Sequence, residues 1–146
     1  MTSKQSYCLG FAFDHRGNVA LIQKLRPAWQ VGKLNGIGGH IEEGETATEA
    51  MVREFREETG RVTTEALWQP FTKMYTDTST VFCFRAFDIS LEGLKTTTDE
   101  QVVIEPAMSE DGYRFERLPN LSWLIPLAMD REVAMTITTY KGGERE

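Results

Sequence analysis

The sequence predicts a single α+β domain that spans residues 1–146. Segments with the apolar content of β-strands lie around two helix-like segments. No repeat, low-complexity tract or linker-like stretch divides the chain, and its length is sufficient to bury a real core. Hydrophobic residues make up 40% and charged residues 26% of the chain, the ordinary balance of a globular protein.

The first half begins with two predicted strands joined by a turn. Residues 6–14 and 19–25 are rich in apolar side chains, and residues 15–18 between them (His-Arg-Gly-Asn) predict a hairpin turn. Four glycines then occur between Gly36 and Gly44. This density indicates backbone held in special conformations rather than a plain strand.

Residues 46–59 form the clearest predicted helix. Thr46 followed by Glu49 fits a capping box, and Gly60 fits the position that ends a helix. Arg53 lies one turn before Glu57, where it can orient that carboxylate.

The second half predicts three further strands and a second helix. Residues 67–75, 80–89 and, more briefly, 101–104 have the apolar content of strands. An irregular segment follows. Residues 122–135 are then apolar enough for a helix, in which Pro126 is tolerable only in the first turn.

Three glutamates share one side of the predicted first helix. At roughly 100° per residue, Glu54, Glu57 and Glu58 fall within an arc of about 100°, and the apolar Met51 and Phe55 lie on the neighbouring arc, facing the core. Like charges at these spacings destabilise a helix by a few tenths of a kcal/mol per pair. An ordinary acidic solvent face is the alternative, but the adjoining glycine turn favours a site for a hard divalent cation.

The glycine turn and the acidic helix together resemble the Nudix box, G-x5-E-x7-R-E-U-x-E-E-x-G-U, in which U is a bulky aliphatic residue. The matching stretch, GHIEEGETATEAMVREFREETG, runs from Gly39 to Gly60. Phe55 is a mild variation at an apolar position, and Arg61 replaces the final aliphatic residue, whose packing Val62 can take over. The chain is therefore identified as a member of the MutT-like Nudix hydrolase superfamily.

The resemblance implies a fold, a metal and a set of residues. The fold is an α/β/α sandwich with a mixed β-sheet between helices. The metal is Mg²⁺, with Mn²⁺ as a substitute. Glu57 and Glu58 resemble its principal ligands. Glu54 is a further ligand or base, the Gly39 carbonyl is another donor, and Arg53 resembles the orienting arginine.

The implied reaction is hydrolysis of a phosphoanhydride by a metal-activated water that attacks phosphorus in line while a carboxylate removes its proton. Many members place this base on a later loop. Glu100 is the candidate here and Asp99 the next, although acidic loop residues are usually only solvated. Glu45 resembles the residue that anchors the glycine turn to the helix.

Two further segments resemble enzymes that clear oxidised purine nucleoside triphosphates. In the first segment, LNGIGG, Asn35 matches the asparagine with which those enzymes contact the edge of the base, and Gly38 is another candidate substrate contact. LPNLSWLIPLAMD resembles their PDDxxWFPL segment, but Asn120 and Leu121 replace two acidic base-reading residues, so specificity for 8-oxoguanine is not implied. Asn120 stays a candidate contact for the base, because its amide offers both a donor and an acceptor. Trp123 is expected either to stack on a purine or to pack in the core.

Cations near the turn are candidates for phosphate binding. Lys24 is the first candidate, and Arg26 and Lys33 are further ones. For each of them, simple solvation at the surface is the alternative. His40 stands where relatives usually have lysine, which makes a contact there weaker or dependent on pH.

Charge and cysteine content restrict the partners. The net charge of -6 argues against a nucleic-acid polymer but not against a small nucleotide substrate. Cys8 and Cys83 lie in apolar stretches and are expected to be buried free thiols. No run of about 18 apolar residues is present, so we expect no membrane contact and a cytoplasmic location. A homodimer is possible, because dimers are frequent in the family.

The function expected from this sequence is Mg²⁺-dependent hydrolysis of a nucleoside triphosphate (dNTP or NTP, including oxidised purines) to monophosphate and pyrophosphate. One alternative is hydrolysis of another nucleoside diphosphate derivative, such as a nucleotide sugar, a dinucleotide or an RNA cap. A second alternative is a Nudix-like domain that only binds a ligand. Such domains commonly lose box glutamates, whereas this chain retains them.

Overall fold

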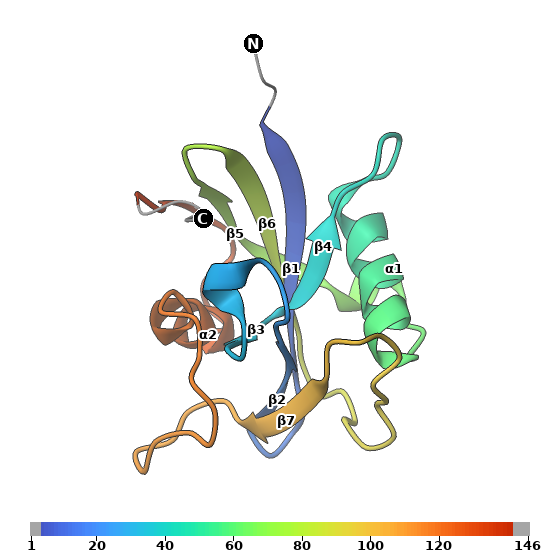
Figure 1. Ribbon diagram of the computed structural model, residues 1–146. Helices are drawn as coiled ribbons and strands as arrows, with labels where there is room; N and C mark the ends of the chain where they lie inside the picture. The colour runs from blue at the N-terminus through green and yellow to red at the C-terminus, as the bar shows by residue number, and fades with distance from the viewer. Residues whose placement is uncertain (1–3, 142–146) are drawn as a thin grey trace.

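A computed structural model describes residues 4–141 and shows one mixed sheet of eight strands between two α-helices (Figure 1). The elements are β1 (Gln5–Phe13), β2 (Asn18–Gln23), the 3-10 turn η1 (Ala28–Gln30), β3 (Leu34–Asn35), β4 (Ile37–His40), α1 (Ala47–Thr59), the 3-10 turn η2 (Glu65–Leu67), β5 (Gln69–Tyr75), β6 (Ser79–Ala86), β7 (Val102–Pro106), α2 (Leu121–Met129) and β8 (Thr136–Thr139). The predicted α/β/α sandwich is confirmed.

The sheet runs β3-β2-β1-β6-β5-β8, with β4 paired to β1 and β7 paired to β2. β1 is parallel to β6 and β5 is parallel to β8, whereas the other pairs are antiparallel. One edge of β1 changes partner along its length. Tyr7 to Gly10 pair with β4, and Ala12 and Phe13 pair with β2. The sheet therefore divides beside β1, where Gly36 connects β3 to β4.

Each face of the sheet buries its own apolar cluster. Phe11, Phe71 and Leu124 belong to the cluster that α2 covers, and Met51 and Phe55 belong to the cluster under α1; all five are fully buried. Fully burying a side chain of this size contributes about 1.5–3 kcal/mol. The predicted apolar arc of the first helix is confirmed.

The ends of α1 are set by the residues that the sequence singled out. Thr46 Oγ1 accepts a hydrogen bond from the Glu49 N–H at 3.0 Å, and Glu49 Oε1 accepts one from the Thr46 N–H at 2.8 Å. Gly60 ends the helix with φ at 79°, a left-handed conformation that favours glycine. The capping box and the helix stop are both confirmed.

The glycine-rich turn contains more strand than its composition predicted. Residues 37–40 form β4, and of the four glycines only Gly44 has a positive φ. The prediction of special conformations throughout was wrong, because lack of space, and not a positive φ, explains Gly36, Gly38 and Gly39. A Cβ at Gly38 would lie 1.9 Å from the Cys8 carbonyl oxygen.

The final helix is shorter than predicted and ends at Met129. Pro126 lies in its second turn, and residues 136–139 form the edge strand β8 instead of a helix end. The buried guanidinium of Arg85 donates to the carbonyls of Ala128 and Asp130, and so satisfies backbone acceptors at the end of the helix. Composition alone did not reveal this long-range contact.

Cys8 and Cys83 are free and buried in neighbouring strands, as predicted. They belong to different apolar clusters, on opposite faces of the sheet. Burial raises the pKa of the Cys8 thiol to about 12 and also raises the pKa of Cys83. No helix within residues 4–141 has the length and apolar content needed to cross a membrane.

Candidate functional site

Gly39 brings the backbone of β4 against the acidic side of α1. A Cβ at Gly39 would lie 2.6 Å from Glu54 Oε1, so any side chain here would displace that carboxylate. The adjacent Gly38 approaches β1 instead. Gly38 therefore has a packing role, and its contact with substrate stays a prediction.

Arg53 connects the glycine turn to the carboxylates of α1. Its Nε and Nη2 donate to the two oxygens of Glu45 at 2.7 and 3.0 Å, and Nη2 also donates to the His40 carbonyl at 2.9 Å. Its Nη1 donates to Glu54 at 3.0 Å and to Glu57 at 3.2 Å. The predicted contact of Arg53 with Glu57 and the anchoring role of Glu45 are confirmed. Charge-assisted bonds of this kind fix the orientation of both partners.

Glu58 has an oxygen without a partner. Its Oε2 is buried and makes no hydrogen bond within the part of the chain that the structure describes. Burial and then the charge of Glu54 raise the pKa of the Glu58 carboxyl to about 8, whereas Lys24 opposes this shift. Burial also raises the pKa of Glu54. An unsatisfied buried carboxylate is costly, and it marks a functional group or a cation site.

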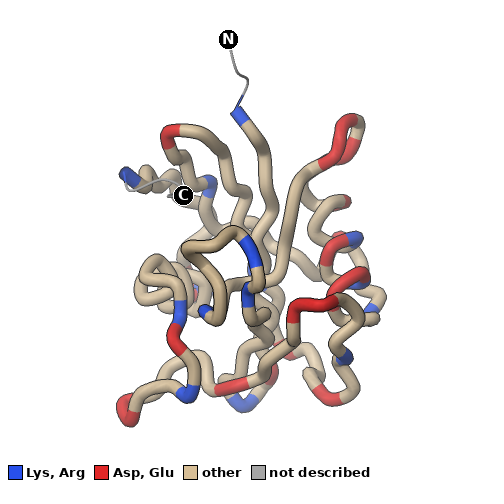
Figure 2. Tube along the Cα trace, in the orientation of Figure 1, with Lys and Arg blue, Asp and Glu red and all other residues tan. Residues whose placement is uncertain are grey.

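The same groups fit a hard divalent cation. Glu54, Glu57 and Glu58 offer carboxylate oxygens, and Gly39 offers a backbone carbonyl, which are the ligand types that Mg²⁺ takes. No three His, Cys, Asp or Glu side chains within residues 4–141 already converge as a complete site. Mg²⁺ keeps several waters and binds substrate phosphates, so it needs no such cage. The unpartnered Glu58 oxygen among neighbouring carboxylates suits this mode of binding, and the acidic residues gather along α1 and the facing loop (Figure 2).

Glu100 lies at the end of the loop between β6 and β7 and faces α1. Its Oε1 accepts from Lys24 Nζ at 3.1 Å, and its Oε2 accepts from the Leu25 N–H at 2.7 Å. Its charge contributes to the raised pKa of Glu58. The second base candidate, Asp99, pairs with Arg26 at the surface, with both side chains at least 60% exposed. The structure thus brings Glu100 rather than Asp99 into a protected position beside the glutamates.

The substrate candidates on β3 and in the segment before it make local contacts. Asn35 Oδ1 accepts from the Gly36 N–H at 2.8 Å, which holds the side chain at the point where the sheet divides. Lys33 pairs with Glu116 at 3.5 Å and so lies apart from the α1 carboxylates. Of the three candidate cations, Lys24 has the clearest connection to the site.

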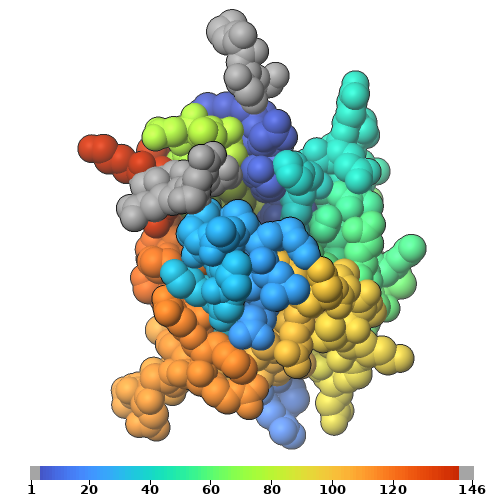
Figure 3. All heavy atoms as spheres, viewed as in Figure 1, coloured from blue at the N-terminus to red at the C-terminus, as the bar shows by residue number. Residues whose placement is uncertain are grey.

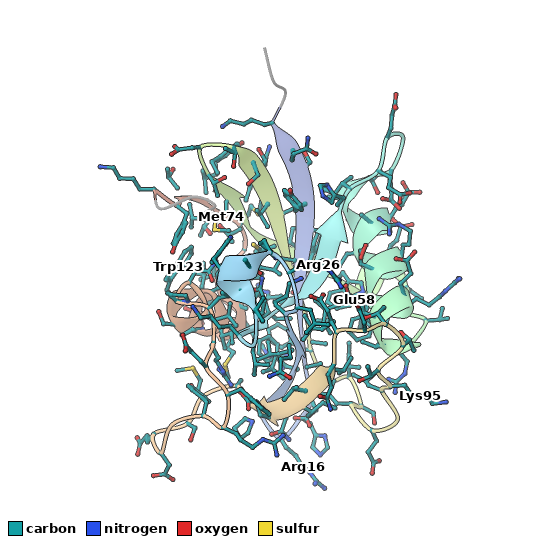
Figure 4. The ribbon with its side chains drawn as sticks, viewed as in Figure 1. Arg16, Arg26, Glu58, Met74, Lys95 and Trp123 are labelled. Atoms are coloured by element: carbon teal, nitrogen blue, oxygen red, sulfur yellow. The ribbon has the colours of Figure 1, made fainter. Side chains whose placement is uncertain are left out.

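Asn120 and Trp123 lie at the start of α2. Asn120 is the N-cap residue but makes no capping bond, and its Oδ1 is buried without a hydrogen-bond partner among residues 4–141. Trp123 packs against the apolar cluster under α2 and stacks on Tyr140 with ring centroids 6.4 Å apart. Figure 4 shows Trp123 on the α2 side and Glu58 on the α1 side. Trp123 and the glutamates therefore lie on opposite sides of the sheet, whereas Asn35 is paired with Ile22 of the cluster under α1 and so faces the same side as the glutamates.

The sequence reasoning missed two residues with distinctive contacts. Trp29 packs at the edge of the α2-side cluster, and its Nε1 is a buried donor without a partner in the described range. Arg61 binds two carbonyls of the loop between β6 and β7. A signal for Arg61 was present, because a charged residue there departs from the box pattern. For Trp29, no motif gave a signal.

An arginine-bound carboxylate cluster on a helix, with a glycine turn packed against it, suits a divalent cation of the kind that activates water in metal-assisted hydrolysis. The NUDIX domain family matches residues 6–123, so the chain belongs to this family of pyrophosphohydrolases. A search of curated proteins found no match.

Several solved structures share the fold. A NUDIX hydrolase from Nitrosomonas europaea is 14% identical with a TM-score of 0.75, over 97% of this chain and 81% of that one. A MutT protein from Bacillus halodurans is 22% identical with a TM-score of 0.71, over 94% and 89%. A MutT/nudix family protein from Enterococcus faecalis is 19% identical with a TM-score of 0.64, over 71% of this chain but only 44% of that longer chain.

Proposed function

We propose that this protein hydrolyses a nucleoside triphosphate, a dNTP or NTP with a normal or oxidised purine base, to the monophosphate and pyrophosphate. The observation that carries the proposal is the unpartnered, buried oxygen of Glu58 beside the Arg53-bound Glu54 and Glu57. This acidic centre is complete only with a cation and the phosphates that accompany it.

The proposed metal ligands are the carboxylates of Glu54, Glu57 and Glu58 and the carbonyl of Gly39. The metal is Mg²⁺, with Mn²⁺ as a substitute. When bound, it supplies neutralisation of phosphate charge and a water of lowered pKa. Arg53 keeps Glu54 and Glu57 oriented towards the same side, so the entropy of arranging them is lost on folding and not during the reaction.

Glu100 is the proposed general base, and Lys24 is the proposed phosphate contact. In the structure these two residues bind each other, and Lys24 Nζ donates to Glu100 Oε1 at 3.1 Å. A polyphosphate that attracts Lys24 frees Oε1 to take the proton of the attacking water. The water oxygen then bonds to phosphorus, the anhydride bond between the α- and β-phosphates breaks, and pyrophosphate leaves. The Leu25 N–H, which donates to Oε2 at 2.7 Å, would keep the carboxylate in place while Oε1 takes the proton.

Asn35, Gly38, Asn120 and Trp123 are the proposed contacts for the nucleoside. The unpartnered Oδ1 of Asn120 suits an amino or ring N–H donor of a purine. Asn35 faces the same side of the sheet as the proposed phosphate site, and Asn120 and Trp123 would extend the nucleoside contacts to the start of α2.

A substrate panel with Mg²⁺ tests the proposal. It contains dNTPs, NTPs, oxidised purine triphosphates, ADP-ribose, NADH and nucleotide sugars, and each is assayed with wild type and with Glu57→Gln. We expect a purine triphosphate to give monophosphate and pyrophosphate, and the variant to lose most of the rate. Reaction in ¹⁸O-labelled water then identifies the phosphorus atom that is attacked, because the label enters one product.

The same panel separates the alternatives. Cleavage of a nucleotide sugar or dinucleotide alone would keep the metal centre but remove the proposed roles of Asn35, Asn120 and Trp123. Tight binding without turnover, for any metal tested, would favour a ligand-binding domain.

A further inference from the structure

Arg61 fastens the loop between β6 and β7 (residues 87–101) to the end of α1. Its Nη1 donates to the Ser90 carbonyl at 2.8 Å, and its Nη2 donates to the Glu92 carbonyl at 2.7 Å. The residues that alternate with them, Ile89 and Leu91, are buried in the apolar cluster under α1. This part of the loop is thus held by the core on one side and by one guanidinium on the other.

Further contacts continue along the loop towards the site. The Lys95 N–H donates to the Thr59 carbonyl at 3.0 Å, and Thr97 Oγ1 donates to the Glu57 carbonyl. Thr98 Oγ1 accepts from the Glu100 N–H at 3.2 Å. The loop therefore lies along the last turns of α1, and Figure 3 shows its yellow and gold atoms beside the green atoms of that helix.

The segment that leads from the Arg61 contact at Glu92 to Glu100 is short and turns sharply. Gly93 adopts φ of 82°, and the Leu94 N–H donates to the Leu91 carbonyl at 3.4 Å, so the chain reverses immediately after the Arg61 contact. The loop then returns along α1 to place Glu100 on Lys24 and on the Leu25 N–H. Fixing the reversal therefore restricts where the following segment can lie.

We propose that Arg61 is a positioning residue that holds the loop between β6 and β7 so that Glu100 stays beside the glutamates of α1. The inference rests on the proposed function, in which Glu100 takes the proton of the attacking water. A planar guanidinium suits this role because its donors can bind two carbonyls at once, which an aliphatic residue cannot do and a lysine does less well. This role would explain why Arg61, a charged residue, stands at the aliphatic position of the box pattern.

Arg61→Val is the sharpest variant, because it restores the aliphatic residue of the box and removes both carbonyl bonds. Arg61→Lys tests partial rescue. Arg56→Ala is the matched control, since it removes an exposed guanidinium from the last turn of the same helix. Each is measured for kcat, KM and backbone hydrogen exchange, alone and combined with Glu100→Gln.

We expect Arg61→Val to lower kcat roughly ten-fold, in the range seen when an outer-shell contact is lost. KM should change by less than about two-fold, because the phosphate and base contacts remain. Exchange should rise in residues 92–101 while α1 and the sheet stay protected. In the Glu100→Gln background, the added effect of Arg61→Val should be less than about two-fold, since both changes act through one group. Arg61→Lys should recover part of kcat, and Arg56→Ala should match wild type.

Two results would overturn the inference. One is unchanged exchange in residues 92–101, which would show that Arg61 does not hold the loop. The other is multiplication of the Arg61→Val and Glu100→Gln effects, which would show that Arg61 acts through something other than Glu100. A wild type that hydrolyses no member of the panel would instead refute the proposed function, and with it the catalytic purpose of Arg61, while exchange still decides whether Arg61 anchors the loop.

Discussion

Glu58 on α1 and Glu105 on β7 are both withdrawn from water, but their surroundings differ. Glu105 Oε1 accepts from Arg117 Nε at 3.1 Å and from Nη2 at 2.8 Å, and each side chain is less than 10% exposed. Arg117 also donates to the carbonyls of Pro106 and Ala107. Glu58, in contrast, keeps a buried oxygen that no donor in the described chain satisfies.

The difference separates a carboxylate that maintains the fold from one that is available for chemistry. The pair of Glu105 and Arg117 ties β7 to the irregular segment that leads into α2, so its bonds are used up within the fold. Glu58 loses solvation without gaining a hydrogen bond at Oε2, and a native structure retains such a cost mainly at functional sites. The two residues should therefore respond in opposite ways to mutation.

The largest expected effect is on activity at Glu58. Glu58→Gln keeps the shape of the side chain but removes the charge that is proposed to hold the metal. A loss of about 4 kcal/mol of transition-state stabilisation corresponds to a fall in kcat of roughly 10³-fold. Steady-state kinetics on the best triphosphate measure this fall. In the absence of metal, the Glu58→Gln variant should be at least as stable in urea as wild type. A ten-fold or smaller loss of kcat would show that Glu58 does not belong to the metal site.

The next effect is on stability at the second pair. Arg117→Ala leaves Glu105 buried without its partner, and breaking a buried pair in this way costs about 3–5 kcal/mol. Urea unfolding measures the change, and the folded fraction should retain the kcat of wild type. Replacing both residues with apolar ones, Glu105→Leu with Arg117→Met, should recover part of the stability. A single variant with less than about 1 kcal/mol of loss would show that the pair behaves like a surface ion pair.

Adjacent glycines repeat the comparison on a smaller scale. Gly38→Ala places a Cβ 1.9 Å from the Cys8 carbonyl oxygen, so β4 must move away from β1. Gly39→Ala meets Glu54 Oε1 at 2.6 Å, and that side chain can turn away. We expect Gly38→Ala to lose about 2–3 kcal/mol of stability, typical of overpacking, and Gly39→Ala to lose less stability but more activity. Unfolding curves and kcat for both variants measure the contrast, and equal losses of stability would contradict it.

Much of the site could be predicted because its residues lie close together in the sequence. The spacing of Arg53 and Glu57 on one helix fixes their contact, and the capping box at Thr46 fixes where that helix begins. The partners that come from distant segments could not be predicted in this way. Glu100 contacts Lys24, which is 76 residues away in the sequence, and Arg85 binds a carbonyl at the end of α2 that is more than 40 residues away. No local periodicity encodes such contacts, and the strand β8 was missed for the same reason.

The role of the metal gives the most selective prediction. Mg²⁺ that binds only the folded protein stabilises it by about 2.7 kcal/mol at a concentration of 100 times its Kd. For a chain of this size, this corresponds to a rise in Tm of roughly 5–10 °C. Thermal melts in EDTA and in excess MgCl₂ measure the rise. Glu58→Gln should lose most of it, because its side chain no longer attracts the ion, whereas Arg117→Ala should melt lower in EDTA and still show the full rise. A rise that persists in Glu58→Gln would place the bound ion elsewhere, and the unpartnered oxygen of Glu58 would then need another explanation.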